Sequence, residues 1–62
     1  MSSRTQIEIA TEVAQDVIDN GRVTLAGDEW SESLRIEVEF ECGERGLDDC
    51  EEIAEAAVNL YR

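Results

Sequence analysis

The stretch LRIEVEFEC, Leu34–Cys42, alternates apolar and charged residues throughout its length. This alternation has the period of a β-strand with one buried face. The face predicted to point inward carries Leu34, Ile36, Val38, Phe40 and Cys42. The face predicted to point outward carries Arg35, Glu37, Glu39 and Glu41. A charged outer face suits an antiparallel sheet with one solvated side, so we expect a strand over residues 34–42.

A second, shorter strand is expected over RVTLA, Arg22–Ala26, where Val23 and Leu25 share one face. The intervening GDEWSES, residues 27–33, is rich in turn-forming residues and reads as a loop. The two strands would pair as an antiparallel hairpin. A lone two-stranded sheet is marginal in water, and edge pairing with a second protomer would remedy this.

A helix is expected over residues 5–20, before the hairpin, because its apolar residues recur at helical spacing. Thr5 and Glu8 are placed to form a capping box at its start. The alternation in TQIEI leaves open a short strand over residues 4–9 followed by a shorter helix.

A second helix is expected over residues 48–62, with Asp48 as its N-cap and Glu51 closing a capping box. The sequence therefore predicts an α+β fold: a small α-β-β-α domain, residues 1–62, with two helices packed on one face of an antiparallel hairpin. A chain of 62 residues makes a single domain of marginal stability.

The charge composition is strongly acidic. Sixteen acids face five bases, giving a net charge of −11, and all five bases are arginine. Lysine is ordinarily among the commonest residues, so its absence beside so many glutamates is unusual. This composition resembles that of haloarchaeal proteins, which have acidic surfaces and few lysines. Molar salt shortens the Debye length to about 3 Å and so tolerates dense like charge. We therefore expect a halophilic protein.

Catalysis has little support in the sequence. The chain has no histidine and no lysine, which removes the usual general base and the Schiff-base nucleophile. We expect no enzyme and no cofactor. No apolar run approaches the length of about 20 residues that a membrane helix needs, so we expect a cytoplasmic protein. The five arginines are scattered rather than clustered, which argues against a nucleic-acid partner.

The two cysteines, Cys42 and Cys50, stand in a C-x7-C spacing that does not match a structural zinc knuckle. A metal site would need two protomers to supply four sulfur ligands. Both cysteines fall on predicted inward faces, so we expect buried, reduced thiols. A disulfide between them and a reactive Cys50 are the alternatives. The intervening GERG, residues 43–46, is expected to be a glycine turn.

The sequence predicts a small non-enzymatic interaction or accessory protein, which acts by self-association and protein–protein contacts. Trp30 lies outside both apolar patterns and could anchor a partner. Unpaired backbone near Phe40, on the longer strand, would favour edge pairing into a homodimer. A larger protein partner is also possible. The alternative functions are a nucleic-acid-mimicking inhibitor and a thiol-based or zinc-bridged regulator.

Overall fold

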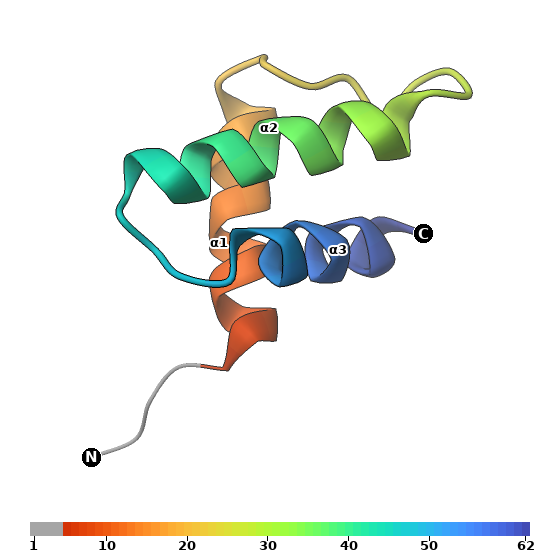
Figure 1. Cartoon of the computed structure of the whole chain (residues 1–62). Helices are drawn as coiled ribbons and strands as arrows, with labels where there is room; N and C mark the ends of the chain where they lie inside the picture. The colour runs from red at the N-terminus through yellow and green to blue at the C-terminus, as the bar shows by residue number, and fades with distance from the viewer. Residues whose placement is uncertain (1–4) are drawn as a thin grey trace.

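The computed structural model of the chain describes residues 5–62, which form three helices joined by two loops (Figure 1). The helices are α1 (Gln6–Asp19), α2 (Trp30–Glu44) and α3 (Cys50–Tyr61). α2 and α3 run side by side in opposite directions, and α1 crosses both of them (Figure 1). No strand is present anywhere in residues 5–62, so the expected α+β fold is wrong and this part of the chain is an all-helical bundle.

Residues 34–42 are helical because their alternation also contains a period of four. Leu34, Val38 and Cys42 are four residues apart, so they fall on one side of a helix, and all three are fully buried. Ile36 and Phe40 fall on the opposite side and are 50% and 60% exposed. Glutamate fills three of the four charged positions in residues 34–42. It forms helices well and is depleted in strands. The predicted strand, with five inward-facing residues, is therefore wrong.

Residues 22–26 form an irregular segment of the loop between α1 and α2, so the shorter predicted strand is also wrong. Val23 is only 6% exposed and joins the core, whereas Leu25 remains 40% exposed. With residues 34–42 in a helix, this segment has no neighbouring strand with which to form a ladder. Val23 instead packs against the core and holds the loop on the bundle.

α1 confirms the helix predicted over residues 5–20, together with its capping box. The Thr5 side-chain oxygen accepts a hydrogen bond from the Glu8 N–H at 3.2 Å. In return, the Thr5 N–H donates to the Glu8 carboxylate at 3.0 Å. Because α1 already begins at Gln6, the alternative strand over residues 4–9 is wrong for the residues described; residue 4 lies outside them.

GERG, residues 43–46, forms the C-terminal end of α2 and does not connect a strand to a helix. Gly46 has φ +72°, and the following Leu47 N–H donates to the Cys42 carbonyl at 3.0 Å. This pattern is a Schellman motif, which satisfies the carbonyls of the last turn and requires a left-handed residue. α1 ends in the same way at Gly21, with φ +74°.

α3 confirms that a helix follows the second glycine, but its start differs from the prediction. The helix begins at Cys50, and the N-cap is Asp49 rather than Asp48. Asp49 has φ +59° and its side chain makes no capping hydrogen bond, so the predicted capping box with Glu51 is absent.

The core is built from small side chains that lie between the three helices. Its buried members are Ala10, Val13, Ala14, Val17, Val23, Leu34, Val38, Cys42, Ile53, Ala54, Ala57 and Val58. Alanine and valine predominate, which lets the helix axes approach closely. Within residues 5–62 no polar or charged residue is buried. The inner face of α2 is thus complete without Ile36 or Phe40.

Candidate functional site

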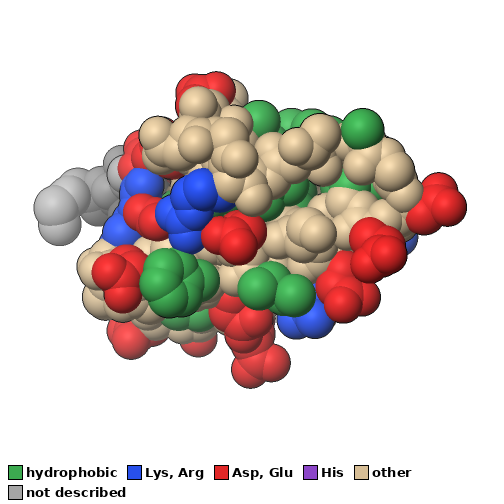
Figure 2. All heavy atoms as spheres, turned by 90° about the horizontal axis from the view of Figure 1, so that it is seen from above, with side chains coloured by type: hydrophobic (Ala, Val, Ile, Leu, Met, Phe, Trp, Pro, Cys, Tyr) green, Lys and Arg blue, Asp and Glu red, His purple; other side chains and the backbone are tan. Residues whose placement is uncertain are grey.

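The candidate functional site is the solvent-facing side of α2. We call it the outer stripe, and it consists of Ser33, Ile36, Phe40 and Gly43, all of which are exposed. Ile36 and Phe40 are one helical turn apart, so their side chains form a single apolar patch. Seen from above, hydrophobic side chains reach the surface of the molecule between acidic ones (Figure 2).

Glutamates flank the outer stripe on both sides. On a helix, residues seven apart lie almost above one another. Glu32 and Glu39 therefore run along one side of the stripe, and Glu37 and Glu44 run along the other. The patch is a narrow apolar strip between two acidic borders.

Arg22 covers one edge of the apolar patch. Its guanidinium carbon lies 5.6 Å from the centre of the Phe40 ring, which is within the range of a cation–π contact. The same guanidinium pairs with Glu37 at 2.9 Å and with Glu41 at 2.6 Å. These contacts tie the loop after α1 to the side of α2. Phe40 nevertheless keeps more than half of its surface open to solvent.

A second arginine, Arg45, joins α1 to the end of α2. It pairs with Glu41 at 3.0 Å, with Glu12 at 3.6 Å and with Asp16. Glu41 thus lies between Arg22 and Arg45. Hydrogen bonds from Arg22 first and Arg45 second lower the pKa of Glu41. This network stabilises the packing of the helices and leaves no free catalytic carboxylate within it.

We predict that the Glu41 carboxyl titrates below the ordinary glutamate pKa and that Arg45→Gln raises its pKa. A carboxylate whose folded-state pKa is depressed stabilises the fold above its unfolded pKa and loses that contribution as the pH falls through the folded value. Carbon-detected NMR titration of the side-chain carboxyl measures this directly. Arg35→Gln is the matched control, because Arg35 pairs with Glu39 instead. A Glu41 pKa at or above the ordinary value would contradict the network.

The two cysteines lie on facing ends of α2 and α3. Cys42 is fully buried, whereas Cys50 is half-buried and its thiol donates to the Leu47 carbonyl at 3.2 Å. Both thiols are free. Burial first, and the neighbouring Cys50 second, raise the pKa of the Cys42 thiol to about 11. Across residues 5–62 no group of three or more Cys, His, Asp or Glu side chains could hold a metal ion.

We predict that a thiol-alkylating reagent at about pH 8 modifies Cys50 in the folded protein and spares Cys42. Cys42 is buried and its raised pKa keeps it protonated, so it has neither access nor thiolate. Peptide mapping by mass spectrometry gives the extent of modification at each site. Both cysteines should react in concentrated guanidinium, which serves as the control. Equal rates in the folded state would show that the α2–α3 end opens readily.

Trp30, the other predicted interaction residue, is the first residue of α2. It is half-buried and packs against the core, so most of its surface serves the fold. Phe40 is exposed, although the sequence placed it inside a sheet. Ile36 was not identified from the sequence as a surface residue. A strand places Ile36 on the same face as Leu34, and only a helix places the two on different faces.

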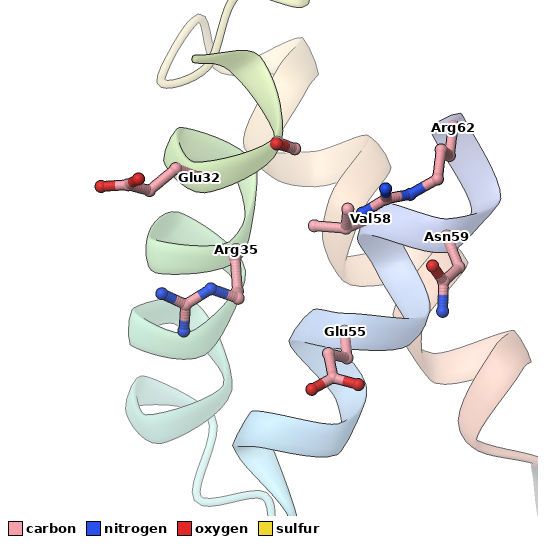
Figure 3. A pocket seen from close by; sticks show the side chains of 7 residues that line it. Glu32, Arg35, Glu55, Val58, Asn59 and Arg62 are labelled. Carbon is pink, nitrogen blue, oxygen red and sulfur yellow. The ribbon is translucent and has the colours of Figure 1, made fainter.

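A surface hollow lies between the start of α2 and the end of α3 (Figure 3). Its lining includes Ser31, Glu32, Arg35, Glu55, Val58, Asn59 and Arg62. Glu32 and Arg35 point away from α3, whereas Arg62 extends from the end of α3 toward Val58 (Figure 3). An active site needs polar groups that converge on one point, and the Glu32 and Arg35 side chains of α2 do not turn into this hollow.

No family model matches the chain, and neither the curated proteins nor the solved structures contain a significant match to it. None of the helices within residues 5–62 is both long enough and apolar enough to cross a membrane.

Proposed function

We propose that the chain is a non-catalytic protein-interaction domain that docks onto another protein through the outer stripe of α2. The observation that carries this proposal is the exposure of Ile36 and Phe40 next to each other on a helix whose core-facing side is already complete. Single exposed apolar residues are ordinary, but an adjacent pair on a heavily charged surface forms a patch suited to binding. Covering apolar surface contributes about 25 cal/mol for each Å² removed from water.

The residue types available support binding rather than catalysis. The sequence contains neither histidine nor lysine. In the hollow between α2 and α3, Glu32 and Arg35 point away from α3, and the Arg22–Glu41–Arg45 network consists of mutually paired groups. We therefore propose an accessory role rather than an enzymatic one.

We also propose that this domain works in a cytoplasm of high salt. The net charge of −11 and the lack of lysine support this setting, and the free thiols of Cys42 and Cys50 accord with a reducing compartment. The homodimer expected from unpaired strand edges loses its basis, because residues 34–42 are helical. Two copies could still pair through the outer stripe, and this is an outcome that experiment can detect.

Site-specific photocrosslinking tests the proposed function. A photoreactive amino acid placed at position 36, in cells that naturally produce the protein, should give a discrete adduct with one partner. The same residue at the exposed position 15, on α1, is the control and should not give that adduct. Phe40→Ser should weaken the adduct while leaving the helical circular dichroism spectrum unchanged. Absence of any adduct specific to position 36 would refute docking through the outer stripe.

A further inference from the structure

We infer that the partner of the outer stripe is a basic amphipathic helix, which packs lengthwise against α2; this inference rests on the proposed function. The four residues of the stripe are separated by three, four and three positions along the chain. This is the spacing of the a and d positions where two helices pack together. Ser33 and Phe40 occupy a positions, and Ile36 and Gly43 occupy d positions.

The residues that border such a seam are glutamate at every position. With this register, Glu37 and Glu44 are at e positions, while Glu32 and Glu39 are at g positions. In paired helices, the charges at e and g decide which partner binds. A helix with lysine or arginine at its own e and g positions would complement all four acids.

The negative charge on these borders is only partly neutralised within the molecule. Glu32 and Glu44 have no ion pair with any residue of the described chain, 5–62. Glu39 pairs with Arg35 only at 3.7 Å, and both side chains are more than a third exposed. Glu37 is held by Arg22 at 2.9 Å. Basic side chains of a partner could therefore pair with Glu32, Glu39 and Glu44, of which only Glu39 has an ion pair within residues 5–62.

A second copy of the chain fits the seam less well than a basic helix. It would present the same four glutamates to those already there, and each copy carries a net charge of −11. Like charges placed opposite one another across an interface oppose association and so suppress the wrong partner. The same electrostatics that disfavour a homodimer favour a basic partner.

The shape of the stripe suits a helix as the occupant. Ile36 and Phe40 protrude at its centre, while the small Ser33 and Gly43 leave room at either end. α2 has 15 residues, which gives a length of roughly 22 Å at 1.5 Å per residue. A partner segment of about four helical turns would run the length of α2 and so cover the stripe.

The test uses two labelled synthetic peptides, each three heptads long with leucine at a and d. One carries lysine at every e and g position, and the other carries glutamate there. Fluorescence anisotropy measures their binding to the purified protein in the lowest KCl concentration at which circular dichroism shows it to be folded. We expect the lysine peptide to bind about tenfold more tightly than the glutamate peptide, with the preference shrinking as salt is added.

Two variants make the result specific to the stripe. Ile36→Ser combined with Phe40→Ser should abolish binding of the lysine peptide. Glu32→Lys combined with Glu39→Lys and Glu44→Lys should reverse the preference toward the glutamate peptide; Glu37 is left unchanged because it holds Arg22.

Equal binding of the two peptides, no binding of either, or mutual crosslinking of two copies through position 36 would each overturn the basic-helix inference. The proposed function is judged separately. A position-36 adduct with a partner that lacks a basic helix would preserve docking and refute only its chemistry.

Discussion

Leu34→Ala is expected to remove a large part of the free energy of unfolding, whereas Ile36→Ala is expected to change it by no more than about 0.5 kcal/mol. Leu34 is fully buried, and truncating a buried leucine to alanine costs about 2–5 kcal/mol. A domain of 62 residues has a total stability of about 3–9 kcal/mol, at 0.05–0.15 kcal/mol per residue. Ile36 is half exposed, and alanine favours the helix more than isoleucine does.

The pair of variants separates the helix from the strand. In a sheet Leu34 and Ile36 would lie on the same inward face, so both replacements would destabilise the fold to a similar degree. Urea denaturation followed by circular dichroism gives the two free energies of unfolding. Phe40→Ala is a second exposed-side variant and should behave like Ile36→Ala. Equal losses for Leu34→Ala and Ile36→Ala would contradict the orientation of α2.

α1 could be predicted from the sequence because its local signals agree. Apolar residues recur at helical spacing along the whole segment, although TQIEI also alternates, and Thr5 with Glu8 supplies a capping box at the correct end. Gly21 then supplies the left-handed residue that ends the helix. These features depend only on residues within about one helical turn of each other, so α1 can be predicted without knowledge of its tertiary contacts.

α2 could not be predicted in this way, because its alternating pattern satisfies a strand and a helix at once. Leu34 and Val38 are inward-facing in both readings, and only Ile36 and Phe40 distinguish them. The choice depends on whether a partner strand exists, which is a tertiary property. Residues 22–26 are the only nearby candidate, and they bury Val23 against the helices instead. The abundant glutamate in residues 35–41 was the local signal that favoured the helix.

The candidate site shows the same dependence on α2. The sequence predicts Phe40 as an interaction residue because an unpaired strand edge is expected there. That edge does not exist, because Phe40 lies in α2. Ile36 could be recognised only after the helix divided the alternating residues between two faces. The start of α3 was also misjudged. The Schellman motif of α2 extends to Leu47, and Asp49 rather than Asp48 then occupies the N-cap position of α3.

The melting temperature of the protein is expected to rise by about 10 °C or more between 0.1 and 3 M KCl. The reason is an excess of unpaired acids. Ion pairs among residues 5–62 involve five of the sixteen acids, namely Glu12, Asp16, Glu37, Glu39 and Glu41. The remaining acids repel one another, and salt screens that repulsion.

The helices themselves add to the repulsion. Like-charged residues four apart, such as Glu51 and Glu55 in α3, destabilise a helix by about 0.2–0.5 kcal/mol per pair. No basic residue lies in the last turn of any helix within residues 5–62, while Asp19 and Glu44 place negative charge at the negative ends of α1 and α2. Each such end costs roughly 0.3–1 kcal/mol at low ionic strength. Together these terms amount to about 2 kcal/mol that screening can recover.

Salt also weakens the attractive ion pairs, so its net effect on the melting temperature depends on whether repulsion or attraction is larger. Exposed pairs contribute about 0.2–1 kcal/mol each and are screened in the same way. Arg22 and Arg45 make most of them, whereas the repulsion is spread over all three helices. Because unpaired acids outnumber paired ones, relief of repulsion should exceed the loss of attraction.

Two variants test that balance from opposite sides. Glu51→Gln combined with Glu55→Gln removes a repulsive pair, so it should raise the melting temperature in dilute KCl and flatten the salt response. Arg45→Gln removes a partner of Glu12, Asp16 and Glu41, so it should lower stability in dilute KCl by about 1 kcal/mol and by less in 3 M KCl, which steepens the response. Thermal unfolding followed by circular dichroism gives all three slopes. A wild-type melting temperature that stays flat or falls with KCl would mean that the two arginines outweigh the acid excess, and it would remove the physical basis for assigning this protein to a high-salt cytoplasm.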